Sequence, residues 1–382
     1  QSPPSPPLAP VVACSPEEVT VVGRVCCESE GKLNAQSIFL EGSRTRSNAC
    51  RARLDVSECA EYALFPGQAV AVTGINAFGH TLAARRVLPG ILPSAFAEPS
   101  PLSSSPAINL FVASGPFTTT DDLSYAPLSE ALSVAEKRAA SALLLLGPFV
   151  DETHPAVAAA DISMSHEELF EKHVIGKIVS FVEEKLSNGG ESPHVILMPS
   201  IKDAHHHPVF PQTAMSAGAL PEHVRPYIHL VANPATVSVG GVRVASCSLD
   251  VLMLLGGQEL ASKPKPGGAR PDRMSRLASH VLKQRLYVPL FPAPSDERAL
   301  LPVDVVSNLN FGSLQSLPDI LVLPSELAPF AKVVEGGVLC LNPGRLTRKQ
   351  AGGNYGLVCV HPAEKGTVDG VASRTCVEIV RI

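Results

Sequence analysis

The sequence predicts an α/β (α+β) protein in which a small antiparallel barrel is followed by a layered domain with a mixed sheet. Residues 14–94 contain short apolar strands separated by Gly-containing turns. From residue 107 onward, apolar strands alternate with amphipathic helical segments, which is the pattern of a layered α/β domain. The stretch AFAEPSPLSSSP at 95–106 is rich in Pro and Ser, so we expect it to link the two domains.

The first domain, residues 14–94, has the strand pattern of an OB-fold. Segments such as VTVVGRVCC, SIFLEG, GQAVAVTGIN and TLAARRVL alternate with Gly-rich turns, and five short strands in a segment of this size fit that small barrel. The preceding tract QSPPSPPLAP cannot build a core, so residues 1–13 are interpreted as the remnant of a linker.

Three strands of the second domain, residues 107–382, end in short Pro-containing loops. They are expected in INLFVASGPFTTTDD (108–122), ALLLLGPFVDETH (142–154) and VILMPSIKDAHHHP (195–208). In an open α/β sheet, ligands bind beyond the carboxyl ends of the strands. A catalytic site would therefore lie in these three loops.

Amphipathic helices are expected to cover this sheet. One is predicted over 127–140, a second over 165–186 with a capping box at Ser165 and Glu168, and a third over 272–287. TVSVGGVRVAS at 236–246 predicts a hairpin on a Gly240-Gly241 turn. Later strands are expected in PDILVLP, GVLCLNPG and TCVEIVRI.

Composition excludes several classes of function. A net charge of -5 gives no overall attraction to nucleic acid, and no apolar run approaches the roughly 18 to 20 residues of a membrane span. The nine cysteines are scattered without any Cys-x-x-Cys pair, which favours reduced thiols in an intracellular protein.

The order of elements resembles the calcineurin-like metallophosphoesterase fold, whose enzymes carry Asp, His and Asn ligands at the strand ends to hold two metal ions. In this chain, Ala113, Ser114, Gly115 and Pro116 stand at the end of the first strand, where the enzymes carry ligands. Pro324, Ser325 and Glu326 follow the later strand ILVL, where the enzymes carry a Gly-His-x-His loop. We therefore expect no catalytic residue, no metal and no cofactor. The predicted vestigial pocket consists of Ser114, Gly147, Pro148, Asp151, Ser200, Asp203, His205 and His206.

The triplet His205, His206 and His207 is the one candidate for a transition-metal site in these loops. Adjacent residues point to different sides, and Pro208 follows directly, so a polar loop is the preferred interpretation. Asp151 and Asp203 are expected to join it in a structural hydrogen-bond or ion-pair cluster.

Two basic groups are candidates for phosphate or nucleic-acid contacts. Arg345, Arg348 and Lys349 lie beside a Gly-Gly pair but do not form a phosphate-loop motif, so they predict a solvated turn with a basic rim. In the barrel, Arg44, Arg46, Arg51 and Arg53 are expected in one loop region, and Phe39, Tyr62, Phe65 and Phe78 are expected to fill the core. Direct DNA binding is therefore expected to be weak or absent.

Six sequence segments, which extend from the barrel almost to the C-terminus, carry a closer resemblance to a known family. The chain is similar to the B subunits of the replicative DNA polymerases, and the Gly-Pro-Phe-x-Asp and Asn-Pro-Gly-Arg-Leu-Thr strings favour the DNA polymerase alpha type over the delta and epsilon types. The strings are FPGQAVAVTGIN (65–76), GPFVDETH (147–154), PSIKDAHHHPVFPQ (199–212), RLYVPLFPAP (285–294), LPSELAPF (323–330) and NPGRLTRKQAGG (342–353).

The resemblance implies a non-catalytic, nuclear scaffold subunit of the DNA polymerase alpha-primase complex. Its partners would be the C-terminal zinc-binding domain of the catalytic subunit and, through the complex, the primase subunits that help to make RNA-DNA primers. That family also has an N-terminal helical domain on a flexible linker, and the first residues here are expected to be the end of that linker. The alternatives are the B subunit of polymerase delta or epsilon, a divergent metal-dependent phosphodiesterase, or a stand-alone single-strand binder.

Overall fold

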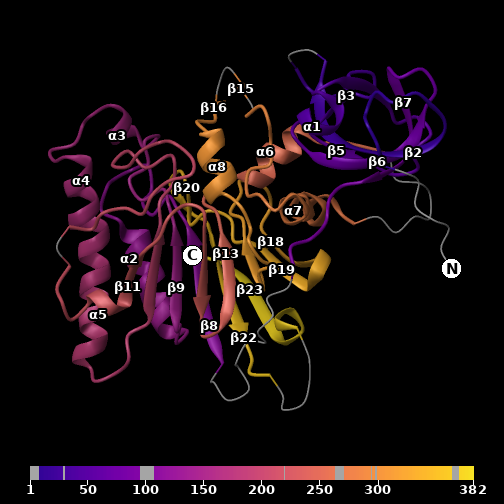
Figure 1. Ribbon diagram of the computed structural model, residues 1–382. Helices are drawn as coiled ribbons and strands as arrows, with labels where there is room; N and C mark the ends of the chain where they lie inside the picture. Colours follow the sequence, from indigo (N-terminus) through magenta and orange to yellow (C-terminus); the bar gives the residue numbers. More distant parts are fainter. Residues whose placement is uncertain are drawn as a thin grey trace. The chain divides into compact units, whose positions relative to one another are not determined.

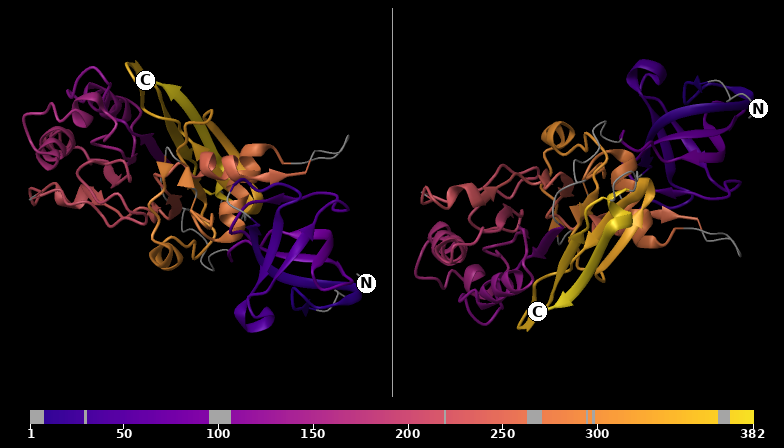
Figure 2. Two further views of the ribbon diagram at one scale, coloured as in Figure 1. Left: turned by 90° about the horizontal axis from the view of Figure 1, so that it is seen from above. Right: turned by 90° about the horizontal axis from the view of Figure 1, so that it is seen from below.

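A computed structural model describes residues 8–28, 31–94, 107–218, 220–262, 271–293, 295–296, 299–363 and 370–382. The chain divides into two compact units (Figures 1 and 2). Unit 1 combines Gln1–Pro93 with Leu252–Leu301, and unit 2 combines Ser94–Val251 with Pro302–Ile382. The expected linker at 95–106 lies outside the described residues.

Unit 1 is built around a closed barrel, as predicted, in which four of the five strand pairings are antiparallel and one is parallel. The strands follow the order β2-β3-β4-β7-β6, and a pairing between β2 and β6 closes the barrel. Alternate residues point inward to a core that includes Val21, Leu40, Leu54, Val72 and Leu82. The strands are β2 (Ser15–Cys27), β3 (Ile38–Gly42), β4 (Arg51–Asp55), β6 (Ala69–Asn76) and β7 (Thr81–Leu88).

Residues 252–301 belong to the barrel unit, which corrects their expected place in the second domain. The two-stranded pairing of β14 with β5 places Leu260 opposite Leu64, and Gln284 accepts the backbone N–H of Ala69 at 2.8 Å. These bonds satisfy backbone groups of the barrel, which ties the segment to unit 1. The remaining elements of unit 1 are β1 (Leu8–Ala9), α1 (Arg44–Ser47), β5 (Ala63–Leu64), α6 (Val251–Gln258), β14 (Leu260–Ala261), α7 (Arg273–Gln284), β15 (Ser295–Asp296) and β16 (Ala299–Leu300).

The interpretation of residues 1–13 as a linker remnant also needs correction. Strand β1 pairs in parallel with β2, with Leu8 opposite Thr20. Val11 is fully buried, its N–H donates to Ser47 Oγ at 3.1 Å, and its carbonyl accepts from Asn76 at 3.0 Å. From Leu8 onward, the chain is therefore part of the barrel unit.

Unit 2 contains two sheets that pack face to face. The first sheet has the order β11-β10-β9-β8-β22-β23, in which β8 to β11 are parallel and β22 pairs antiparallel with both β8 and β23. Its strands are β8 (Ile108–Ser114), β9 (Ala142–Leu146), β10 (His194–Met198), β11 (Ile228–Leu230), β22 (Asn354–Val360) and β23 (Thr375–Arg381).

The second sheet has the order β12-β13-β17-β19-β18 and mixes parallel and antiparallel pairs. Leu144 of the first sheet and Val244 of the second belong to one buried apolar core. The strands are β12 (Ala235–Val239), β13 (Val242–Ser246), β17 (Ile320–Val322), β18 (Phe330–Val334) and β19 (Val338–Asn342), and a small hairpin pairs β20 (Thr347–Arg348) with β21 (Ala351–Gly352). The Gly240-Gly241 turn between β12 and β13 is confirmed, with positive φ at both residues.

Helices cover the other face of the first sheet (Figure 1). The capping box of Ser165 and Glu168 is confirmed, because both reciprocal hydrogen bonds are present. The helix that follows changes to a six-residue π-helix before it resumes as α5. The helices of unit 2 are α2 (Ala126–Lys137), α3 (Pro155–Ala158), α4 (His166–Leu169), the π-helix η1 (Phe170–Ile175), α5 (Gly176–Ser187), α8 (Val305–Phe311) and the 3-10 turns η2 (Arg225–Tyr227), η3 (Glu335–Gly337) and η4 (Val371–Arg374).

Within the described part of the chain, no helix has both the length and the apolar character that a membrane crossing requires. The nine cysteines are free thiols, of which Cys247 and Cys340 are buried.

Candidate functional site

The three strand ends predicted to surround a catalytic site do lie side by side. Ser114 of β8 is in register with Leu146 of β9, and Leu146 is in register with Met198 of β10. The ladder continues one residue into the loops, since the Gly115 N–H bonds to Leu146 O at 2.7 Å and the Gly147 N–H bonds to Met198 O at 2.8 Å. The expectation that these loops meet at one edge of the sheet is therefore met.

The loops pack against each other backbone to backbone. A Cβ atom added to Gly115 would lie 2.0 Å from the Pro148 carbonyl oxygen, and one added to Gly147 would lie 2.5 Å from Asp203 Oδ2. Real Cβ atoms essentially never come within 3.0 Å of a heavy atom to which they are not bonded. The two glycines are thus required by the close approach of the loops, and the space between the strand ends is filled by the protein itself.

Asp203 holds the loop after β9 to the loop after β10. It is 2% exposed, and its Oδ1 accepts the backbone N–H groups of Phe149 at 2.5 Å and Val150 at 2.9 Å. Its Oδ2 accepts the N–H of Ser200 at 2.8 Å. Burial raises the pKa of Asp203 to about 7, against the opposing effect of these three N–H donors. Both carboxylate oxygens are therefore directed at backbone groups inside the protein.

Asp151 lies next to Asp203 through a backbone bridge, but its carboxylate is used locally. Its Oδ1 accepts the Thr153 N–H at 2.9 Å and the Thr153 hydroxyl at 2.8 Å. This is a short side-chain turn of the kind that Asp commonly forms. The two acidic residues predicted for the pocket are neighbours in the backbone and have different structural roles.

His205 and His206 also take structural positions. The His205 side chain is 4% exposed and stacks on Phe170 of the π-helix, with ring centroids 4.2 Å apart. Neither ring nitrogen of His205 has a hydrogen-bond partner in the described residues, and burial lowers its pKa to about 4. His206 Nε2 instead bonds to the Thr213 carbonyl at 3.0 Å.

Arg345 departs from the predicted basic rim. It is 6% exposed, and its Nη1 donates to Ser114 Oγ at 3.0 Å, while its Nε lies 3.3 Å from Glu326 Oε1. The guanidinium thus occupies the end of β8, where a metallophosphoesterase would place metal ligands. Arg348 and Lys349 are exposed on the β20–β21 hairpin, so these two fit the solvated turn.

Buried amides connect the remaining loops, and they were not among the predicted site residues. Asn233 donates to Gln212 Oε1 at 2.9 Å and to Ser248 Oγ at 2.8 Å, and Ser248 in turn donates to Pro199 O at 2.7 Å. Asn342 accepts the N–H groups of Ser325 and Gly344, each at 2.9 Å. Their positions close to strand ends were the only available signal, since an isolated Asn carries no motif.

This arrangement does not fit a two-metal centre. No group of three or more His, Cys, Asp or Glu side chains in the described residues could hold a metal ion. Except for the buried His205, the side chains at the strand ends are already bonded to the backbone or to one another, and a metal ligand needs free lone pairs and an open position. We therefore derive no metal-dependent step for these loops.

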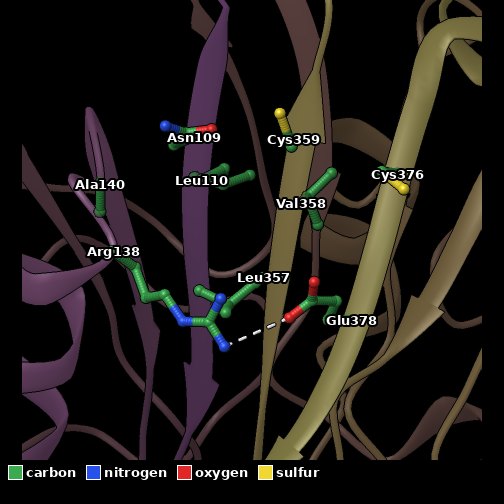
Figure 3. Close-up of a pocket in the computed structure, with 9 residues that line it drawn as sticks. All are labelled: Asn109, Leu110, Arg138, Ala140, Leu357, Val358, Cys359, Cys376 and Glu378. Atoms are coloured by element: carbon green, nitrogen blue, oxygen red, sulfur yellow. Dashed lines mark ion pairs between the residues drawn. The ribbon is translucent and has the colours of Figure 1, made fainter.

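A small open pocket of about 110 Å³ lies elsewhere on the same sheet (Figure 3). It is lined by Leu357 and Cys359 of β22 beside Leu110 of β8, and Arg138 faces Glu378 across it at 3.4 Å. It is far smaller than the 300 Å³ or more that typical ligand sites enclose. We assign it no catalytic role.

Two family models match the chain. The model for the B subunit of DNA polymerases alpha and epsilon matches residues 110–332, and the model for the OB domain of the DNA polymerase alpha B subunit matches residues 5–90. The two matched ranges cover the barrel and most of unit 2.

Curated relatives give the same result. The DNA polymerase alpha B subunit of Rattus norvegicus is 33% identical over 94% of this chain and 57% of its own length, and that of Schizosaccharomyces pombe is 35% identical over 92% and 61%. The chain thus spans somewhat more than half the length of these relatives. A solved structure, TT1561 of Thermus thermophilus, matches 72% of this chain and 99% of its own with a TM-score of 0.31 and 12% identity, which is too distant to support an argument.

Proposed function

The chain belongs to the family of B subunits of DNA polymerases alpha and epsilon, and from this membership we propose that it is the non-catalytic scaffold of the DNA polymerase alpha-primase complex. It would bind the C-terminal zinc-binding domain of the catalytic subunit, connect to the primase subunits through that complex, and act in the nucleus during RNA-DNA primer synthesis. Curated relatives, which are B subunits of DNA polymerase alpha, support the alpha assignment over delta or epsilon.

The observation that carries the non-catalytic part of this proposal is the bonding of Asp203. An acidic residue in a phosphoesterase loop would have to direct its carboxylate at a metal or at water. Here the carboxylate accepts three backbone N–H groups and links two loops. This bonding supports a structural role for the strand ends.

We propose that α8 forms part of the contact with the catalytic subunit. Val306 is 68% exposed, Leu309 is 60% exposed and Phe311 is 73% exposed, although all three are apolar and lie on one seven-residue helix. Exposed apolar side chains that gather in this way commonly mark a protein interface. The helix begins next to the loop after β10, because the Asp304 N–H bonds to Phe210 O at 2.9 Å.

Two measurements separate this proposal from its alternatives. The chain is titrated by calorimetry with the C-terminal domains of the alpha, delta and epsilon catalytic subunits in turn, and we expect binding to the alpha domain about tenfold tighter or more, a difference of about 1.4 kcal/mol. Equal or tighter binding to delta or epsilon would overturn the alpha assignment.

Hydrolysis of a chromogenic phosphodiester is measured in parallel with added Mn²⁺ or Zn²⁺. We expect no turnover above a heat-denatured control. Turnover that Asp203→Asn or Asp151→Asn abolishes in a folded variant would establish the phosphodiesterase alternative.

A further inference from the structure

On the outer face of the barrel, aromatic and basic side chains of β3 and β4 lie in one row that runs across the strands. Backbone pairing places Cys26 of β2, Phe39 of β3, Arg53 of β4 and Thr81 of β7 in one row across four strands. All four positions point away from the barrel core, since their neighbours at alternate positions along the strands are buried. The next row along contains Arg24, Glu41 and Arg51.

The loop of residues 77–80 borders this row and exposes an aromatic ring. Phe78 is 77% exposed and stacks on His80 with ring centroids 6.0 Å apart and an interplanar angle of 13°. The Arg53 N–H donates to the His80 carbonyl at 2.9 Å, which fixes the loop beside Arg53. Phe39 and Phe78 were both expected in the barrel core, and both expectations are wrong. Phe39 lies on the outer face of β3, between the buried Ile38 and Leu40, and the exposed Phe78 ring lies at a tight turn.

These positions correspond to the surface that OB-folds commonly use for ligands. β3 and β4 are the second and third strands of the five-stranded barrel, and residues 77–80 connect the fourth strand along the chain to the fifth. Oligonucleotides bind OB-folds across the second and third strands and beside that loop. Base stacking on aromatic rings and phosphate contacts to Arg are the interactions that single strands use there.

The arginines near this face favour a phosphate ligand, although the chain as a whole is negatively charged. Arg51 and Arg53 are exposed on β4, and Arg44 and Arg46 are exposed on α1 just before it. Glu41 opposes them in part, since its carboxylate pairs with Arg51 at 2.6 Å. Because the whole chain has a net charge of -5, any affinity must come from this face and be sensitive to salt.

We propose that the outer face of β3 and β4, together with residues 77–80, is a binding site for single-stranded nucleic acid. A base stacks on Phe78, and the phosphates of the strand lie along Arg53 and Arg51. Weak or absent DNA binding was expected from the sequence, and this face is where a weak contact is made. The inference goes beyond the proposed scaffold function, because this site would bind nucleic acid without any other subunit.

The test is fluorescence anisotropy of the full chain with a labelled oligothymidylate of about twelve nucleotides, a length within the range that one OB-fold binds. Binding at low salt is expected. Phe78→Ala should weaken it by about fivefold or more, which is the lower range for loss of one stacked base. The double variant Arg51→Gln, Arg53→Gln should reduce the slope of log affinity against log salt by about 1.4, because each phosphate contact to a single strand contributes about 0.7.

Matched controls come from unit 2. Val333→Ala shortens an apolar side chain that is 58% exposed on β18, and Arg381→Gln removes an exposed strand arginine. Neither should change the affinity.

Absent binding at low salt, or binding that the Phe78 and Arg variants leave unchanged, overturns the proposal. A polyglutamate peptide, added as a competitor, tests whether the face binds an acidic protein segment and not a nucleic acid. If it displaces the oligonucleotide with equal strength and Phe78→Ala has no effect, the face recognises charge alone and the single-strand site is wrong. Because the catalytic subunit is absent from this experiment, its outcome does not depend on the proposed scaffold function.

Discussion

Arg345 Nη1 donates a hydrogen bond of 3.0 Å to Ser114 Oγ, although the two residues are 231 positions apart in the chain. The bond joins the loop after β19 to the end of β8 and places a permanent positive charge where a metallophosphoesterase would gather metal ions. A cation already present at this position disfavours a second one. The arrangement makes the strand ends part of the framework of unit 2.

Replacing Arg345 should destabilise the protein. Arg345→Met leaves the buried Ser114 hydroxyl without its donor, so we expect a loss of about 2–4 kcal/mol in the free energy of unfolding. Urea unfolding followed by circular dichroism measures it. Arg348→Met, on the exposed hairpin, is the matched control and should change stability by less than about 0.5 kcal/mol. Equal losses of unfolding free energy in the two variants would show that Arg345 contributes no more to stability than a surface arginine.

Asp203→Asn should be more harmful than Asp151→Asn. An amide retains one acceptor oxygen but turns an N–H donor toward the N–H of Phe149, Val150 or Ser200, depending on its orientation, and we expect a loss of about 2–3 kcal/mol. Asp151 is only partly buried and its carboxylate bonds to Thr153, so its variant should lose under about 1 kcal/mol. Thermal unfolding of both variants at neutral pH compares them, and the reverse order would contradict the structural role of Asp203.

His205 should make the protein less stable in mild acid. Burial lowers its pKa from 6.5 to about 4 in the folded state, so between these values the unfolded chain binds the extra proton and the folded chain does not. The contribution of His205 to the free energy of unfolding is therefore fully present above pH 6.5. It is lost progressively as the pH falls to about 4, by up to about 3 kcal/mol.

His205→Phe tests this dependence. A phenyl ring can keep the stacking on Phe170 and has no nitrogen to protonate. Asp203, whose pKa is raised to about 7, stabilises both proteins as the pH falls. On going from about pH 7 to about pH 4.5, values that span the titration of the unfolded His, the variant should therefore lose less unfolding free energy, or gain more, than the parent. A change of the same size in both proteins would exclude this contribution of His205. His207→Phe, an exposed neighbour in the same triplet, should leave the pH dependence unchanged.

The exposed face of α8 should contribute to the contact with the catalytic subunit. Leu309→Ser with Phe311→Ser should weaken binding of that protein's C-terminal domain by about tenfold or more, because large apolar residues at an interface centre often contribute over about 1 kcal/mol each. Val333→Ser, at a residue that is 58% exposed on β18 of the same unit, is the control. Unchanged affinity in the α8 variant, with an unchanged melting temperature, would place the interface elsewhere.

Local signals in the sequence predicted local structure well. The capping box at Ser165 and the Gly240-Gly241 turn depend on residues a few positions apart, and both are present. The strands at 108–114, 142–146 and 194–198 were recognisable because a strand buried on both faces is mostly apolar along its length.

Long-range relationships could not be predicted in this way. The assignment of 252–301 to the barrel unit depends on bonds such as Tyr62 N–H to Ser262 Oγ, at 3.2 Å, between residues 200 positions apart. The burial of Arg345 depends on the distant Ser114, and Arg51 and Arg53 proved to lie on a strand where a loop was expected. The sequence identified which residues lie in the loops after β8, β9 and β10, whereas their hydrogen-bond partners became visible only in three dimensions.

The most direct test of the scaffold proposal is light scattering on a size-exclusion column, with the chain alone and mixed with the C-terminal domain of a DNA polymerase alpha catalytic subunit. The account predicts a single peak whose mass equals the sum of one copy of each chain. Two separate peaks at the masses of the folded, individual chains would contradict it.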